Sequence, residues 1–121
     1  MKSNNLKLTI SLIVIYILSG SFNVSAQQSD KKTEIKIKTS AVCSMCKERI
    51  ESNMAYEKGV SFVELDLETK MVSIRYRADK TNPDKLRQAI ANIGYDADDV
   101  MANPKKYEKL PACCKKDAPP H

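Results

Sequence analysis

The chain has 121 residues and a formal net charge of +5, with 20 Lys and Arg residues against 15 Asp and Glu residues. This length suits one small domain and leaves no room for a second hydrophobic core. Positive and negative side chains are interleaved along the chain without a basic block, so the composition argues against nucleic acid as a partner.

Residues 1–26 have the pattern of a secretory signal peptide. Lys2 and Lys7 precede an apolar stretch over residues 8–18, and the segment ends on the small residues Val24-Ser25-Ala26. The apolar stretch is shorter than the ~20 residues that span a bilayer. We therefore expect cleavage after Ala26, no stable membrane insertion afterwards, and a periplasmic or secreted protein. The net charge falls from +5 to +3 when the two lysines are lost.

The first strand and the first helix are predicted after a polar, flexible lead-in over residues 27–32. Residues alternate between apolar and polar over 33–40, which is typical of a half-buried strand. Apolar residues then recur every fourth position over 46–58. That spacing predicts a helix, and Gly59 is expected to end it.

A hairpin and a second helix follow. Alternating residues over 60–67 and 71–77 predict two antiparallel strands joined by a short turn. Asn82-Pro83-Asp84 supplies a helix cap, a proline for the first helical position and an acidic residue in the first turn. The apolar face of this helix continues to Ile93, and Gly94 is expected to end it.

Residues 95–100 are short and acidic, and we predict an edge strand there. The order strand, helix, strand, strand, helix, strand indicates an α+β, ferredoxin-like sandwich: a four-stranded antiparallel sheet with both helices on one face. The predicted core consists of Ile35, Ile37, Ile50, Met54, Val63, Leu65, Val72, Ile74, Leu86, Ile90 and Ile93.

Cys43-Ser44-Met45-Cys46 lies between the first strand and the first helix. This placement predicts two thiols on one exposed, electropositive turn. Such a pair can bind one soft metal ion or close a small redox disulfide, and free amides at a helix N-terminus stabilise the thiolate that either reaction needs. Thiolates select copper(I), mercury(II), cadmium or zinc over hard ions. Two sulfurs alone suit copper(I) or mercury(II), whereas zinc takes four ligands.

The chain resembles the heavy-metal-associated domain family over residues 34–100. The resemblance is carried by residues 39–46 with the two cysteines, by Gly59-Val60, by the hairpin at 66–72, and by Ile93-Gly94-Tyr95-Asp96-Ala97. It implies a non-enzymatic domain at 33–100 that binds copper(I) or mercury(II) through Cys43 and Cys46. Tyr95 falls where the family has a tyrosine that shields the site.

The resemblance also implies a partner and a mechanism. The partner is a metal-donating or metal-accepting protein with exposed thiolates, such as a transporter, and the ion passes to it through a shared thiolate complex. One feature departs from the family: its usual Gly-Met-x-Cys lead-in is replaced by Ser40-Ala41-Val42-Cys43. Met45, between the cysteines, is expected either to pack as an apolar side chain or to approach the ion.

The tail at 101–121 contains a second pair of cysteines. Residues 104–110 predict a short helix, and Cys113 and Cys114 follow it. These residues have three interpretations: they bind metal, they pair with Cys43 and Cys46, or they serve another molecule. If they join the site, the preference shifts toward zinc or cadmium, or copper is stored more tightly. His121, the single histidine, lies at the chain end and is not expected to be a ligand.

Two other functions remain open from the sequence. The first is a thiol-disulfide redox protein in which Cys43 and Cys46 exchange with Cys113 and Cys114. The second is a structural domain in which all four cysteines form disulfides.

Overall fold

The computed structural model describes residues 32–118. The predicted signal peptide (1–26), most of the predicted lead-in and His121 lie outside the described residues. The lead-in was predicted one residue too long, because strand β1 (Lys32–Lys38) already begins at its last position. Across residues 32–118, no helix has the length and apolar character needed to cross a bilayer.

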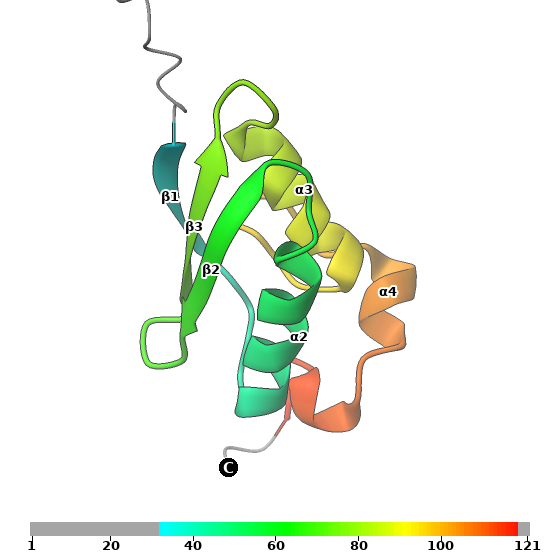
Figure 1. Ribbon diagram of the computed structural model, residues 1–121. Helices are drawn as coiled ribbons and strands as arrows, with labels where there is room; N and C mark the ends of the chain where they lie inside the picture. Colours follow the sequence, from blue (N-terminus) through cyan, green and yellow to red (C-terminus); the bar gives the residue numbers. More distant parts are fainter. Residues whose placement is uncertain (1–31, 119–121) are drawn as a thin grey trace, which may run out of the picture.

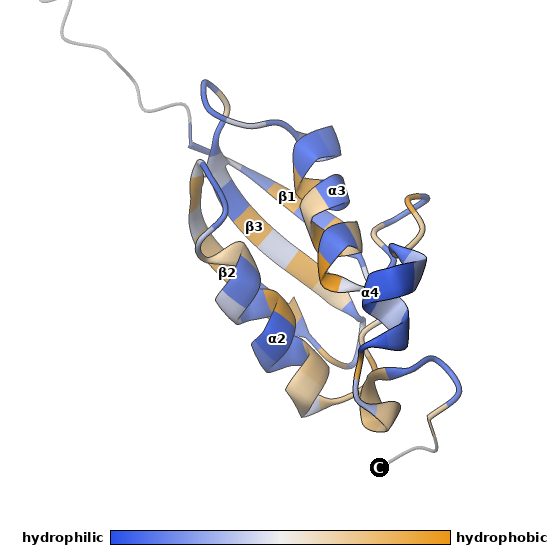
Figure 2. Cartoon of the chain, turned by 90° about the vertical axis from the view of Figure 1, so that its right-hand side faces the viewer, coloured by the Kyte–Doolittle hydropathy of each residue, from blue (hydrophilic) through white to orange (hydrophobic). Residues whose placement is uncertain are grey.

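The sheet contains three antiparallel strands in the order β1-β3-β2. Strand β2 (Val60–Asp66) and strand β3 (Met71–Arg77) form the predicted hairpin, and β3 lies in the middle. Helix α2 (Ser44–Met54) and helix α3 (Pro83–Ile93) cover one face of the sheet (Figure 1). Along β3, apolar residues alternate with polar ones, as a sheet with one buried face requires (Figure 2).

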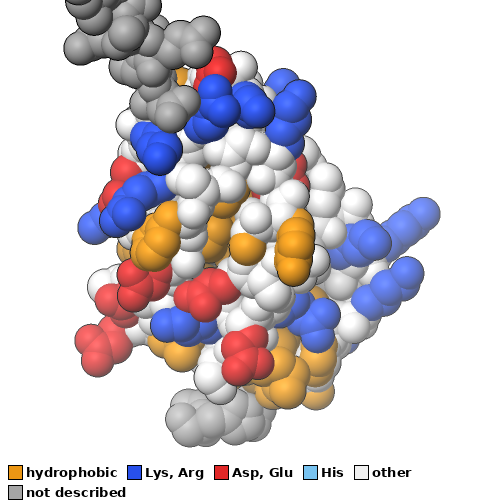
Figure 3. Space-filling model, in the orientation of Figure 1, with side chains coloured by type: hydrophobic (Ala, Val, Ile, Leu, Met, Phe, Trp, Pro, Cys, Tyr) orange, Lys and Arg blue, Asp and Glu red, His pale blue; other side chains and the backbone are white. Residues whose placement is uncertain are grey.

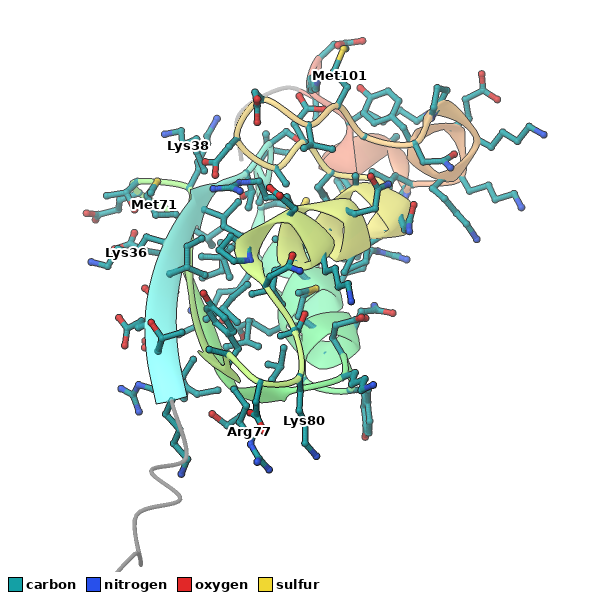
Figure 4. The ribbon with its side chains drawn as sticks, turned by 90° about the horizontal axis from the view of Figure 1, so that it is seen from above. Lys36, Lys38, Met71, Arg77, Lys80 and Met101 are labelled. Carbon is teal, nitrogen blue, oxygen red and sulfur yellow. The ribbon has the colours of Figure 1, made fainter. Side chains whose placement is uncertain are left out.

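The predicted fourth strand at 95–100 is not formed within the described chain. Ala97 makes only isolated bridges, one to Thr39 and one to Val100. The amide of Ala97 donates to the carbonyl of Val100 at 2.9 Å and the reverse bond is also 2.9 Å, so the chain turns back after one residue. Asp98 adopts a positive φ of 52° in this turn. The amides and carbonyls of Ala97 and Val100 are therefore used inside the turn, while the Asp98 amide donates to the carbonyl of Lys38 in β1 at 2.8 Å. Figure 4 shows the loop that carries Met101 curving past the end of β1, where Lys38 lies.

Helix α3 has the boundaries that its sequence predicts. The side chain of Asn82 accepts a hydrogen bond from the amide of Lys85 at 2.9 Å, and Pro83 is the first helical residue. Gly94 ends the helix with a left-handed φ of 118°. Helix α2 differs from the prediction of 46–58: it begins two residues earlier and ends at Met54, where two turn hydrogen bonds replace the helical ladder.

The core lies between the sheet and the two helices. Of the predicted core, Ile35, Val63 and Ile93 are only partly buried, and the rest are buried. The prediction missed several buried side chains, and most of them belong to the region around the cysteines. These are Ala41, Cys46, Tyr76, Tyr95, Ala97, Leu110 and Cys114.

The C-terminal part of the described chain packs against the two long helices. Helix α4 (Pro104–Glu108) occupies most of the predicted 104–110 helix and contacts α3. A short 3-10 helix, η1 (Ala112–Cys114), contacts α2. Leu110, between them, is buried in the core.

Candidate metal centre

The two motif cysteines lie at the N-terminus of α2. Cys43 is the N-cap residue with extended backbone angles, and Cys46 lies in the first turn. Their Sγ atoms are 3.2 Å apart, so the two side chains converge on one point. The amides of the first helical turn carry a partial positive charge, which favours thiolates at this end of α2.

The two thiols differ in exposure, and the prediction of an exposed pair was half right. Cys43 is partly exposed, whereas Cys46 is fully buried. Cys46, Ile50 and Met54 follow each other at every fourth position, and all three face the core. Lys47 on the solvent face forms an ion pair with Glu51 at 3.7 Å.

The tail cysteines lie in the same cluster. The Sγ of Cys114 is 3.9 Å from that of Cys43 and 4.0 Å from that of Cys113. The sulfurs of Cys43, Cys113 and Cys114 all lie within 4.8 Å of one another, which is close enough to hold one ion. All four cysteines are free thiols. The structure therefore brings together every cysteine of the chain.

Met45 is not a core residue, because 47% of it is exposed. The thiol of Cys113 donates to the Sδ of Met45 at 3.7 Å. These two residues help to line a hollow of about 520 Å³ beside Cys43, with Val42, Ser44 and Leu67. Figure 3 shows apolar side chains gathered at this end of the molecule, where α2 begins and η1 lies. Solvent and other molecules therefore reach the Cys43 thiol through a hollow with a largely apolar lining.

Tyr95 closes the site from the side of α3. It is fully buried, and its hydroxyl lies against the thiols of Cys114 and Cys46 without forming a hydrogen bond of good geometry among residues 32–118. Burial raises the pKa of Tyr95 strongly, and the thiols of Cys114 and Cys46 raise it further. The phenol therefore stays protonated beside the sulfurs.

The thiols differ in acidity. Burial raises the pKa of Cys46, but contacts with the Cys114 thiol, the Val42 backbone and the Cys43 thiol bring it below its ordinary value. Burial and Cys46 raise the pKa of Cys43. Burial, followed by Cys46, raises the pKa of Cys114 to about 12. Cys46 is thus the first of these three thiols to ionise, and a bound ion must displace the protons of the others.

The binding loop differs from the family pattern at Ser40 and Ala41, and both residues make contacts that hold the loop. Ala41, in place of the usual methionine, is fully buried. The hydroxyl of Ser40 accepts a hydrogen bond from the amide of Asp96 at 2.9 Å. The loop that precedes Cys43 is therefore held to the segment after α3.

Comparisons with known proteins agree with this arrangement. The model of the heavy-metal-associated domain matches residues 37–96. The copper chaperone CopZ of Staphylococcus haemolyticus is 32% identical over 54 residues, which are 45% of this chain and 79% of that protein. The chain belongs to the heavy-metal-associated domain family. Membership of this family assigns heavy-metal binding to the chain.

Other relatives of this heavy-metal-associated protein include a far longer one. A copper-exporting P-type ATPase of Staphylococcus epidermidis is 35% identical over 71 residues, which are 54% of this chain but only 9% of the ATPase.

Two solved structures share the fold. A CopZ metallochaperone has a TM-score of 0.52 at 27% identity and covers 54% of this chain and 98% of its own. Oxidized MerP from Ralstonia metallidurans has a TM-score of 0.53 at 25% identity, with 55% and 93% covered. All these matches cover about half of this chain.

Proposed function

We propose that this protein binds copper(I) through Cys43 and Cys46 and transfers it to or from a partner protein in the cell envelope. The observation that carries the proposal is the convergence of the two thiols, 3.2 Å apart, at the N-terminus of α2. Thiolates prefer soft ions, and two relatives are named as a copper chaperone and a copper-exporting ATPase. Mercury(II) is the second soft ion that this chemistry accepts, and MerP shares the fold.

The geometry suggests how the ion enters and leaves. Cys46 has the lower pKa and the buried position, so it supplies the first thiolate. Cys43 is partly exposed beside the apolar hollow. A thiolate of the partner binds the ion there while the bond to Cys43 breaks, and the ion then passes on without entering water. The partner is accordingly a protein with exposed thiolates, such as a transporter.

The location is a further part of the proposal and is supported by the signal-peptide pattern of residues 1–26. We expect the mature protein to begin at Gln27 and to be recovered from the periplasmic fraction or the medium of a Gram-negative host. Intact-mass measurement of the protein from each fraction tests this. Recovery of the full-length chain from the cytoplasm alone would contradict it.

The test of metal binding is an anaerobic titration of the reduced protein with copper(I) against a competing chelator. We expect the Cys43→Ser, Cys46→Ser double variant to lose high-affinity binding. Ser44→Ala is the matched control, since it changes the same turn without removing a sulfur, and it should bind like the unaltered protein.

A thiol-disulfide function is the second candidate, because two sulfurs 3.2 Å apart are also close enough to form a disulfide with little movement. Insulin reduction measured in parallel separates the two functions. Catalytic reduction of insulin, together with copper binding that the double variant retains, would overturn the copper proposal and support the redox function.

A further inference from the structure

The tail that carries Cys113 and Cys114 is attached on both sides of the cysteine pair. Before the pair, Leu110 is buried and packs where Gly94 has no side chain. After the pair, the amide of Lys116 donates to the hydroxyl of Tyr107 at 3.0 Å. The ammonium group of Lys116 also forms an ion pair with Asp96 at 2.5 Å. Asp96 follows Tyr95, so the tail is tied to the segment that closes the site.

The sulfur separations fit a site with more than two ligands. At the zinc–thiolate distance of about 2.3 Å, sulfurs around one ion lie about 3.8 Å apart in a tetrahedral site and about 4.0 Å apart in a trigonal one. The pairs Cys43–Cys114 and Cys113–Cys114 measure 3.9 and 4.0 Å. A linear two-thiolate site would need a separation of about 4.6 Å between its sulfurs. The Cys43–Cys46 separation of 3.2 Å is below all three values, so these two sulfurs must move apart when they bind one ion.

Two more observations point to a ligand inside this cluster. Cys114 is 1% exposed although it lies only four residues from the end of the described chain, so the tail folds this thiol back into the molecule. Tyr95 brings a fully buried hydroxyl, without a hydrogen bond of good geometry among the described residues, against the same sulfurs. The sulfurs of the cluster contact one another and the Sδ of Met45, which are weak hydrogen-bond partners, so a soft ion would be a stronger partner for them.

We propose that Cys113 and Cys114 join Cys43 and Cys46 in one closed thiolate site, which holds copper(I) with three or four sulfurs. The segment 111–116 is then a lid that supplies ligands: a partner's thiolate can reach the ion beside Cys43, but the lid must move before the ion is released. This inference rests on the proposed function of Cys43 and Cys46. It makes the protein a tighter and slower donor of copper than a domain with the CxxC pair alone.

The first experiment counts the sulfurs. X-ray absorption on the copper(I)-loaded mature protein should give three or four sulfur neighbours at the longer distance of a trigonal or tetrahedral site. In the Cys113→Ser, Cys114→Ser double variant the count should fall to two. Its copper affinity should fall by at least about tenfold. Removal of a residue that only hydrogen-bonds to a metal ligand already lowers metal affinity by about tenfold or more, and these two residues are proposed as ligands themselves.

The outcomes separate this inference from the proposed function. Two sulfur neighbours in the unaltered protein, with unchanged affinity in the Cys113→Ser, Cys114→Ser variant, would overturn the four-cysteine site and leave the CxxC site intact. Tight copper binding by the Cys43→Ser, Cys46→Ser variant would instead overturn the proposed function. Free thiols are counted in every sample, so that oxidation is not mistaken for loss of a ligand.

A second variant tests the lid with all four thiols in place. Lys116→Met removes the ion pair to Asp96, and we expect copper(I) to pass to a competing chelator severalfold faster while the sulfur count stays the same. Lys109→Met is the matched control, because Lys109 is an exposed lysine of the same tail. Equal rates for the unaltered protein and Lys116→Met would refute a lid that limits release.

Discussion

Replacing Gly94 with alanine should both destabilise the fold and loosen the tail. Gly94 has a φ of 118°, in the region that side chains disfavour. An added Cβ would lie 3.1 Å from the carbonyl carbon and oxygen of Lys106 and 3.3 Å from Leu110 Cδ2. The left-handed backbone costs about 1–2 kcal/mol for an L-residue. Because the close contact is with the backbone of α4, the neighbour cannot rotate away, and the helix itself must shift.

Gly59 offers a matched control for this effect. Its φ is 82°, and an added Cβ would lie 3.0 Å from side-chain atoms of Lys80 and Thr81, far from the tail. Gly59→Ala therefore has a similar backbone cost without a direct effect on α4. We expect a loss of roughly 1–2 kcal/mol in the free energy of unfolding for Gly59→Ala, and about 1 kcal/mol more for Gly94→Ala.

Urea denaturation gives the stability of both variants. The rate at which Cys114 reacts with a thiol reagent in the folded, metal-free protein reports the position of the tail. Cys114 is almost completely buried, so it should react slowly in the unaltered protein and in Gly59→Ala, and much faster in Gly94→Ala. If Gly94→Ala were no less stable than Gly59→Ala and its Cys114 equally protected, the reasoning about α4 would be refuted.

Three further changes test separate parts of the structure. Asn82→Ala removes the side-chain cap of α3 and should lower the free energy of unfolding, measured by urea denaturation, by about 1 kcal/mol. A loss below ~0.3 kcal/mol would contradict a stabilising cap. Tyr95→Phe removes a buried hydroxyl that forms no hydrogen bond of good geometry among the described residues, so the metal-free protein should be equally stable or more stable. A loss of about 1 kcal/mol or more would reveal a hydrogen bond to the Cys114 or Cys46 thiol. Burial raises the pKa of Asp98, but hydrogen bonds from Arg87 and the Lys38 amide lower it below its ordinary value. The Asp98 carboxylate therefore stabilises the fold above its unfolded pKa of about 3.9, and this contribution is lost as the pH falls through the lower folded pKa. Stability measured against pH should decline less steeply below about pH 4 in Asp98→Asn than in the unaltered protein, and identical slopes would contradict the ion pair.

Local signals predicted most of the fold. Asn82, Pro83 and Gly94 define the ends of α3 because each satisfies a requirement of the backbone at its own position. The hairpin turn follows from residues 66–70: the side chain of Asp66 accepts the amides of Glu68 and Thr69, and Lys70 adopts a positive φ. The fourth strand was wrong because the choice between a ladder and a tight turn at residues 97–100 depends on hydrogen bonds that form only in the folded chain.

The sequence by itself determined the CxxC pair, its position before a helix and hence the convergence of Cys43 with Cys46, since that geometry needs only one helical turn. The tertiary structure alone decided that Cys46 is buried and that Cys114, 71 positions from Cys43, lies against the site. That approach depends on α4 packing onto Gly94 and on Lys116 reaching Asp96. The spacing of apolar residues predicts one helix or strand at a time, whereas contacts between distant elements form only when the whole chain has packed.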